Sequence, residues 1–341
     1  MTAYILRRLV IGVGMLMAMS LVTFVLFFAG GDPSRSLCNK DCTPERITSI
    51  SKTMGFDKPV MTQYGEFLKG LFVDREYPND PEYRAKVAKT HPEVIVTCHA
   101  PCLGYSVSQQ RSVNSILAEA APITISISVV AFLLWIFFGV LLGVIAAVFK
   151  GRALDRGLVG ATLVIYAMPT FFIGNLLLQY VSLRWGIIRY PSYVSIADGG
   201  PWNWFMGLIL PASTLAVFFM AAYVRITRAF VLESLSEDYI RTARAKGLPG
   251  RIVLFKHALR AALTPLVSMA GLDFASLLAG SVITEYVFNF HGLGALAVQA
   301  NHDLDLPVLI GLVLVAGTAV ILMNIIVDVL YAFIDPRVRL D

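Results

Sequence analysis

Four cysteines offer the most direct chemistry in this sequence of 341 residues. They form two closely spaced pairs, Cys38-x-x-x-Cys42 and Cys98-x-x-x-Cys102. In an oxidising compartment such pairs form disulfides, whereas cysteine together with histidine can hold zinc. His91 and His99 lie close to the second pair, so a metal site is the alternative to disulfides. Four cysteines allow three pairings, and the sequence does not choose among them.

Two acidic residues, Asp273 and Asp328, lie inside long apolar stretches. Ionisable residues inside a membrane mark functional sites by default, and an embedded pair of carboxylates could cleave peptide bonds. Each aspartate could equally face a water-filled path or pair with a neighbouring subunit. The sequence has no G-x-x-x-x-G-K-[ST] phosphate loop, no H-E-x-x-H zinc motif and no G-x-S-x-G nucleophile motif. We therefore expect this chain to be no enzyme and to bind no ATP, metal or other cofactor.

The composition explains why the elements that position these residues are membrane helices. Hydrophobic residues make up 57% of the chain and charged residues 15%, and the mean hydropathy is +0.69. Soluble domains carry roughly a quarter charged residues, and a membrane helix needs about 20 apolar residues in a row. Six such stretches can be drawn, at about 9–29, 123–149, 158–181, 205–224, 265–282 and 307–333, with Pro169 interrupting the third. The sequence predicts an all-α integral membrane protein with about six transmembrane helices.

The cations that flank these stretches fall on one side of the membrane when the number of crossings is even. They are Arg7, Arg8, Lys150, Arg152, Arg156, the cluster from Arg225 to Arg260, Arg337 and Arg339. Short connections rich in Lys and Arg stay in the cytoplasm, so both termini of this cell-membrane protein are expected there. The net charge of +5 then reflects orientation, and no nucleic-acid partner is expected.

This orientation places the long connection, residues 30–121, outside the cytoplasm. Long loops translocate largely regardless of their charge, so the cations within this connection do not contradict the assignment. An oxidising exterior favours disulfides over a metal site for the four cysteines. The chain is thus divided into an N-terminal transmembrane helix (1–29), an extracytoplasmic loop or lobe (30–121) and a five-helix core (122–341).

Within the core, residues 233–262 form a polar and basic segment. Residues 237–246 are good helix formers, with acidic Glu237 and Asp238 first and basic Lys246 last, as the helix dipole favours. Gly247 suits the left-handed position that closes a helix, and a second short helix is expected over 251–262. Small residues at 243, 245 and 247 would let a partner come close. The segment is predicted to be a two-helix cytoplasmic knob that another protein grips, the alternative being an ordinary solvated loop.

The same segment carries a family resemblance. Residues 239–248, followed by 257–260 and 263–265, resemble the EAA coupling motif of ABC importer permeases. Ordered matches elsewhere are similar to the B-type permease subunit of dipeptide and oligopeptide importers: Arg7-Arg8, Gly31-Asp32-Pro33, residues 54–60 with Gln63-Tyr64, residues 103–106, Leu210-Pro211, residues 285–288, Gly292-Leu293-Gly294 and Asp335-Pro336-Arg337. Arg241 and Thr242 stand where the motif is named for Glu and Ala. The outer loop looks longer than is usual in the family.

The resemblance implies the type I ABC importer permease fold and a division of labour among subunits. This chain would pair with a second, homologous permease in the lipid bilayer, and two cytoplasmic ATP-binding domains or subunits would hold ATP and Mg. An extracytoplasmic substrate-binding protein would deliver a di- or oligopeptide. The residues of the ATPase-coupling motif are Tyr239, Arg241, Thr242, Ala243, Lys246, Gly247, Leu248, His257 and Pro265. Polar residues at membrane depth that could line the path are Asp273, Glu285 and Asn324.

A secondary transporter or channel for small solutes would also explain about six spans. It would need coupling-ion residues or an inverted internal repeat, and the sequence shows no clear halves of that kind. The cargo itself stays open, because related permeases carry other small solutes, including metal complexes.

Overall fold

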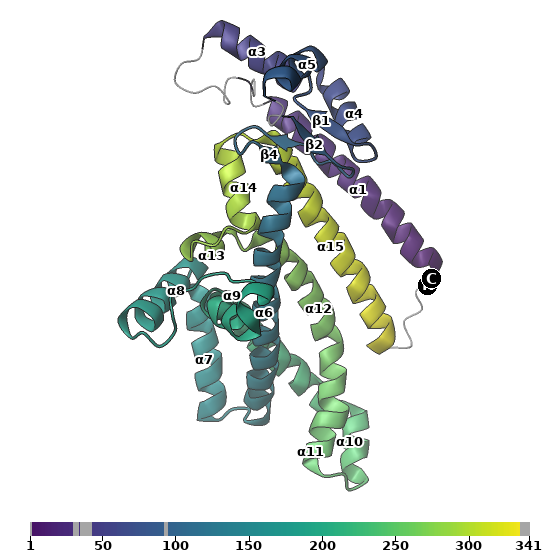
Figure 1. Ribbon diagram of the computed structural model, residues 1–341. Helices are drawn as coiled ribbons and strands as arrows, with labels where there is room; N and C mark the ends of the chain where they lie inside the picture. Colours follow the sequence, from purple (N-terminus) through teal and green to yellow (C-terminus); the bar gives the residue numbers. More distant parts are fainter. Residues whose placement is uncertain (1, 30–33, 35–42, 92–94, 335–341) are drawn as a thin grey trace. The chain divides into compact units, whose positions relative to one another are not determined.

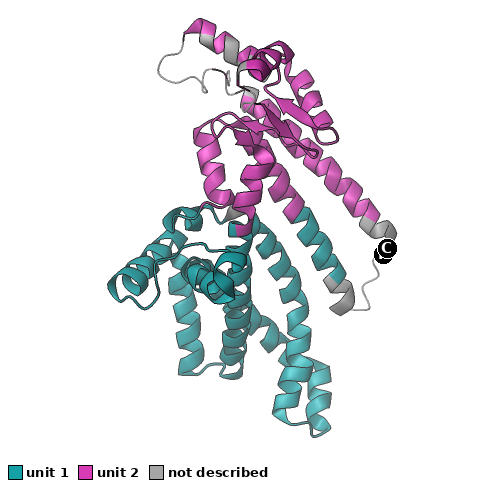
Figure 2. Ribbon diagram, in the orientation of Figure 1, with its two compact units in different colours: residues 1–5, 123–290, 320–341 teal, residues 6–122, 291–319 magenta. Residues whose placement is uncertain are grey.

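The computed structural model describes residues 2–29, 34, 43–91 and 95–334 (Figure 1). In this part of the chain, five helices are long and apolar enough to cross a membrane, or six if one bent pair counts as a single span. The chain divides into two compact units (Figure 2). Unit 1 comprises Met1–Ile5, Ile123–Phe290 and Val320–Asp341, and unit 2 comprises Leu6–Pro122 and His291–Ala319. The division predicted from the sequence has three continuous segments, 1–29, 30–121 and 122–341. Each compact unit, by contrast, combines separate stretches of the chain, so the two divisions differ.

All regular elements among the described residues of unit 1 are helices. Its elements are the greater part of α6 (Val113–Val148), α7 (Ala153–Ala167), α8 (Thr170–Leu176), the π-helix η2 (Leu177–Arg184), α9 (Ile196–Ser236), α10 (Asp238–Ala245), α11 (Gly250–Ile252), the π-helix η3 (Val253–Ala258), α12 (Leu259–Gly280), α13 (Val282–Val287) and the end of α15 (Leu306–Ile334). An aromatic cluster lies at its centre. Trp135 is fully buried and stacks on Phe219, with ring centroids 4.5 Å apart.

Helices α6 and α9 approach each other closely because glycines of α6 leave room for backbone contact. A Cβ on Gly139 would lie 2.8 Å from the Cβ of Tyr223, and a Cβ on Gly143 would lie 2.6 Å from the Cβ of Thr227. The two glycines form a G-x-x-x-G pattern, which is typical of closely packed membrane helices. This contact fixes the two longest helices of unit 1 against each other.

The stretch predicted to be a third span, 158–181, is two helices bent by 103°. Pro169 precedes α8 as its N-cap, and Met168 before it is extended, with ψ 136°. A residue that precedes proline avoids the helical region, so α7 ends there. The interruption predicted at Pro169 is confirmed, and it is a sharp bend between α7 and α8.

Two other spans are longer than the apolar stretches that predicted them. The stretch 205–224 lies within α9, which starts at Ile196, turns at Gly200 with φ 73° and continues to Ser236. The expected short helix over 251–262 is no separate element, because α11, η3 and α12 follow one another without a break. Pro265, expected at the start of a span, lies inside α12. Hydropathy detects only the apolar part of a helix. The ends of these helices, which contain more polar residues, were therefore predicted to be loops.

Unit 2 contains α1 (Thr2–Ala29, from Leu6), a small lobe, α14 (Leu293–His302) and the first part of α15. The lobe elements are α3 (Pro44–Met54), α4 (Val60–Gly70), β1 (Arg75–Tyr77), α5 (Pro81–Thr90), β2 (Val96–Cys98), β3 (Tyr105–Ser106) and β4 (Arg111–Ser112). Strand β1 pairs antiparallel with β2, and β3 pairs antiparallel with β4. Phe24 of α1 packs with Tyr64 and Phe67 of α4 in one buried cluster. The predicted outer loop is therefore a folded lobe attached to α1.

Candidate functional site

Residues 233–262, the predicted coupling segment, lie in unit 1 and include the amphipathic helix α10. Ile240 and Ala243 form its buried face, and they pack in one cluster with Val253 and Ala258. Figure 1 shows α10 and α11 together at the end of unit 1 far from α13. Ala243 is only 6% exposed, so its small side chain serves packing within the segment. The expectation that Ala243 lets a partner come close stays a prediction.

Gly247 adopts the conformation expected of it. Its φ is +76°, and no atom outside its neighbours lies within 4 Å of the position a Cβ would take. The Gly247 N–H donates to the Arg244 carbonyl at 2.9 Å, and the Leu248 N–H donates to the Ala243 carbonyl at 3.3 Å. Such bonds close a helix with a left-handed residue. The exposed turn thus leaves an open surface at Gly247.

The exposed surface of residues 239–257, called the tip below, is apolar as well as basic. Its exposed large hydrophobic residues are Tyr239, Leu248, Ile252 and Phe255. Arg241, Thr242 and Lys246 are exposed on the same segment, and His257 is half-buried in η3. Grouped exposed apolar side chains rimmed by polar ones mark a protein-binding surface. Pro265, half-buried within α12, lies outside this tip.

An ion pair joins α9, the helix that leads into this segment, to α7. Arg228 donates from Nε to Asp155 Oδ1 at 2.6 Å and from Nη2 to Oδ2 at 2.8 Å. The Gly151 N–H also donates to Asp155 Oδ2, at 2.8 Å. Sequence reasoning missed this pair because 73 residues separate its members. In the sequence, this pair is indicated only by the position of Asp155 directly after a basic loop.

The acidic residues at membrane depth lie in different surroundings. Glu285 is fully buried and accepts hydrogen bonds from Thr124 and Ser281, both at 2.6 Å. It joins α13 to α6 and lines no open surface of this chain, and the path-lining role expected of Glu285 stays a prediction. Asp273 is half-buried and accepts a hydrogen bond from the Tyr223 hydroxyl at 2.7 Å. Asn324 is also half-buried, on α15.

In the lobe, Cys98 and Cys102 form a disulfide. Both are buried, together with Tyr77, and the Tyr77 and Tyr105 rings stack at 5.4 Å. Burial raises the pKa of Tyr77. His99 lies with Nδ1 2.9 Å from Asp74 Oδ2. The described residues contain no group of His, Cys, Asp and Glu that could hold a metal ion. Cys38 and Cys42 lie outside the residues that the structure describes.

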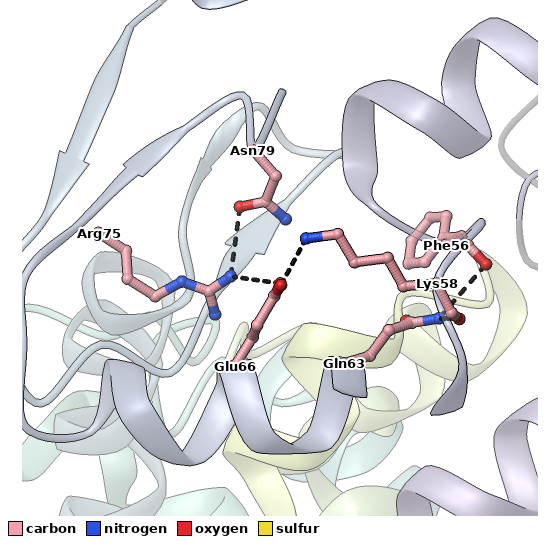
Figure 3. Close-up of polar contacts among 6 residues, drawn as sticks. All are labelled: Phe56, Lys58, Gln63, Glu66, Arg75 and Asn79. Atoms are coloured by element: carbon pink, nitrogen blue, oxygen red, sulfur yellow. Dashed lines mark hydrogen bonds and ion pairs between the residues drawn. The ribbon is translucent and has the colours of Figure 1, made fainter. Parts of the chain in front are cut away.

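A network of charged side chains joins the lobe elements around Glu66 of α4 (Figure 3). Lys58 donates to Glu66 Oε1, and Arg75 Nη2 lies 4.0 Å from Glu66 Oε2. Arg75 also donates to Asn79 at 3.2 Å. Two pockets of about 80 and 320 Å³ flank this network. Glu66 contacts both cations, so the network links the loop before α4, α4 itself and β1 within the lobe.

A second buried contact in unit 2 joins the strand β3 region to α15. Ser106 and Ser108 both donate to Asp305 Oδ2, at 2.5 and 2.7 Å, and Asp305 is only 3% exposed. Asp305 directly precedes α15. Sequence reasoning included Ser106 in a motif but gave Asp305 no role.

Comparisons with known proteins agree with this arrangement. The family model described as "Binding-protein-dependent transport system inner membrane component" matches residues 139–340. The model described as "Binding-prot-dependent transport system membrane comp, N-term" matches residues 1–128. Together the two models cover nearly the whole chain, including both the lobe and the coupling segment.

Curated relatives match over their full length. A protein of Brucella abortus (strain 2308), named provisionally as a peptide transport system permease protein, is 34% identical over 342 residues and covers 100% of both chains. The dipeptide transport system permease protein DppB of Escherichia coli (strain K12) is 33% identical over 363 residues, with 99% of each chain covered. These relatives are similar along both units.

Among solved structures, a chain of the MetNI methionine ABC transporter in inward-facing conformations matches with a TM-score of 0.53. The match covers 64% of this chain and 96% of that chain, at 18% identity. An identity this low shows a shared fold and nothing more. About two thirds of this chain therefore shares the fold of that ABC transporter chain.

Proposed function

The chain belongs to the family of binding-protein-dependent transport system inner membrane components, and on this basis we propose that it imports peptides as one half of an ATP-driven transporter. A second permease of the same fold completes the translocation path in the membrane. Two cytoplasmic ATPases bind and hydrolyse ATP with Mg, and an extracytoplasmic binding protein delivers the cargo. The names of the curated relatives support peptides, and dipeptides in particular, as the cargo class.

One observation carries this proposal: the exposed apolar tip around Gly247. Tyr239, Leu248 and Phe255 are 44%, 36% and 59% exposed. Such side chains at the end of a helical segment fit a groove in a partner protein. The tip is continuous with α9 on one side and with α11 to α12 on the other, so a partner that moves it also moves two membrane helices.

The proposed orientation follows from the same segment. With the coupling segment in the cytoplasm, the positive-inside rule keeps both termini there and the lobe outside. The folded lobe then faces the binding protein, and its disulfide suits an oxidising exterior. We assign the docking of that protein to this lobe.

The test begins with a tagged chain isolated from its native membrane. A second permease and ATPase subunits should copurify with it. In right-side-out vesicles supplied with the extracytoplasmic protein fraction, uptake of a labelled dipeptide should require internal ATP. An ionophore that dissipates ion gradients should leave this uptake in place. Uptake that follows an ion gradient and ignores ATP would replace the importer with a secondary transporter.

A further inference from the structure

Like Asp328 of α15, Asp273 is an acidic residue at membrane depth that is only half-buried in unit 1. It lies within α12, and it is half-buried. Glu285, by comparison, is fully enclosed. Among the described residues, Asp273 accepts one side-chain hydrogen bond, from the Tyr223 hydroxyl to Oδ2 at 2.7 Å. Its second oxygen is left to accept from a group outside these residues.

The side chains next to Asp273 are closely packed. Tyr223 is 1% exposed, and its ring centroid lies 6.1 Å from that of Trp135. Its Cβ faces Gly139 so closely that even a methyl group there would clash. Phe274, next to Asp273, meets Phe132 edge-on at 5.0 Å. These contacts fix α12 and hold the carboxylate at one orientation.

The face in front of Asp273 is open in this chain. Leu272 is 56% exposed and Met269 is 37% exposed. Ser276, one turn further along, is exposed, and its hydroxyl donates back to the Asp273 carbonyl at 2.8 Å. A carboxylate that faces hydrocarbon is costly, so intramembrane acids face a water-filled cavity or an opposite charge. The exposed neighbours Leu272 and Met269 are apolar, so Asp273 is the charged position on this face of α12.

We propose that Asp273, oriented by Tyr223, is a subsite in the translocation path that binds the terminal ammonium group of a peptide. This inference rests on the proposed function. An ammonium group supplies the hydrogen-bond donors and the positive charge that an ionised carboxylate lacks. Every unmodified peptide carries this group whatever its sequence, so one carboxylate recognises the whole cargo class. A single ion pair in a wet path also binds weakly enough to release the cargo.

The test measures how the charge of Asp273 changes the labelling rate of a thiol introduced at a neighbouring position in the assembled transporter. Ser276→Cys is compared with the double variant Ser276→Cys/Asp273→Asn, and the unaltered chain gives the background labelling. Each is treated with a positively charged and a negatively charged methanethiosulfonate. The positive reagent should react faster with Ser276→Cys, and Asp273→Asn should lower the ratio of the two rates about five- to tenfold. Copurification with the ATPase subunits confirms that each variant is assembled.

Protection by peptides then identifies the bound group. Alanyl-alanine at millimolar concentration should slow labelling of Ser276→Cys, whereas N-acetyl-alanyl-alanine should not, and Asp273→Asn should abolish the difference. Equal protection by both peptides would overturn the ammonium subsite. A thiol that reacts with neither reagent would also overturn it, because Asp273 would then face lipid or a buried subunit contact. ATP-dependent uptake by the unaltered transporter, measured separately, tells this failure apart from failure of the importer proposal.

Discussion

Arg228 and Asp155 join α9 to α7 through two parallel hydrogen bonds, Nε to Oδ1 at 2.6 Å and Nη2 to Oδ2 at 2.8 Å. The carboxylate is nearly enclosed, with its side chain 4% exposed, and the guanidinium is 27% exposed. A bidentate pair fixes orientation as well as distance. Because α9 ends at Ser236 and α10 begins at Asp238, this pair secures the helix that carries the coupling segment.

Breaking this pair should loosen the base of the segment. Arg228→Lys keeps the charge but loses the two-pronged geometry, and Asp155→Asn keeps the shape but loses the charge. We expect both variants to lower the thermal midpoint of the purified transporter and to reduce the peptide imported per ATP hydrolysed. The exchange Asp155→Arg/Arg228→Asp should restore part of both values. If each single variant behaves as the unaltered protein does, the pair makes no contribution to coupling.

The turn at Gly247 should tolerate no side chain if a partner covers it. Gly247→Asp places a charge on the exposed tip and a Cβ at φ +76°. We expect it to abolish ATP-driven uptake while membrane insertion remains, as measured by uptake and by the amount of protein in the membrane. Gly186→Asp is the matched control, because Gly186 has φ +61° with open space around it and lies outside the segment. Equal loss in both variants would assign the effect to backbone strain.

Close contact between α6 and α9 should make Gly143 intolerant of even a methyl group. A Cβ there would lie 2.6 Å from the Thr227 Cβ and 2.9 Å from the Val224 carbonyl oxygen. Overpacking of this kind costs about 1–3 kcal/mol, so Gly143→Ala should lower the thermal midpoint. Gly160→Ala in α7 meets open space and should leave the midpoint unchanged or raise it, since Ala favours a helix over Gly. A neutral Gly143→Ala would mean that the two helices are not held at this distance.

The Cys98–Cys102 disulfide should matter to the lobe and not to the membrane core. It is buried against Tyr77, whose ring stacks on Tyr105. We expect Cys98→Ser/Cys102→Ser to weaken stimulation of the ATPases by loaded binding protein while basal ATPase activity stays unchanged. Cys98→Ala/Cys102→Ala, which leaves no polar atom in this apolar site, separates loss of the bond from burial of a hydroxyl. Unchanged stimulation in both variants would exclude docking at this part of the lobe.

Residues with strong local preferences were predictable from sequence, whereas those defined by distant partners were not. Gly247 and Pro169 act through their own backbone restrictions, so the turn and the helix break could be predicted at the right positions. The length of α9 could not, because residues 225–236 mix charged and polar side chains with apolar ones, so hydropathy alone does not show that the helix continues. Helices continue beyond the lipid where tertiary packing supports them.

The same distinction separates the site residues. The burial of Ile240 and Ala243 follows from the amphipathic pattern of α10. The burial of Glu285 does not, because its partner Thr124 is 161 residues away. An acid in an apolar stretch looks the same in sequence whether it lines a path or braces two helices. The surrounding fold decides between these roles.

Asp305 should be essential for the junction between the lobe and α15, because it accepts hydrogen bonds from two serines at one buried oxygen. Asp305→Asn replaces one oxygen with an NH₂ group, which cannot serve as the acceptor if it takes the place of Oδ2, and it removes the charge that strengthens both bonds. Hydrogen bonds to charged groups contribute about 1.5–3 kcal/mol each. We therefore expect faster amide hydrogen exchange over residues 105–109 and at the start of α15. Asp303→Asn is the matched control, since the Asp303 side chain is 33% exposed and its carboxylate lies beside the exposed His302. Equal exchange in Asp305→Asn and the control would show that the serines are held by backbone contacts alone, in which case Ser106→Ala should also have no effect.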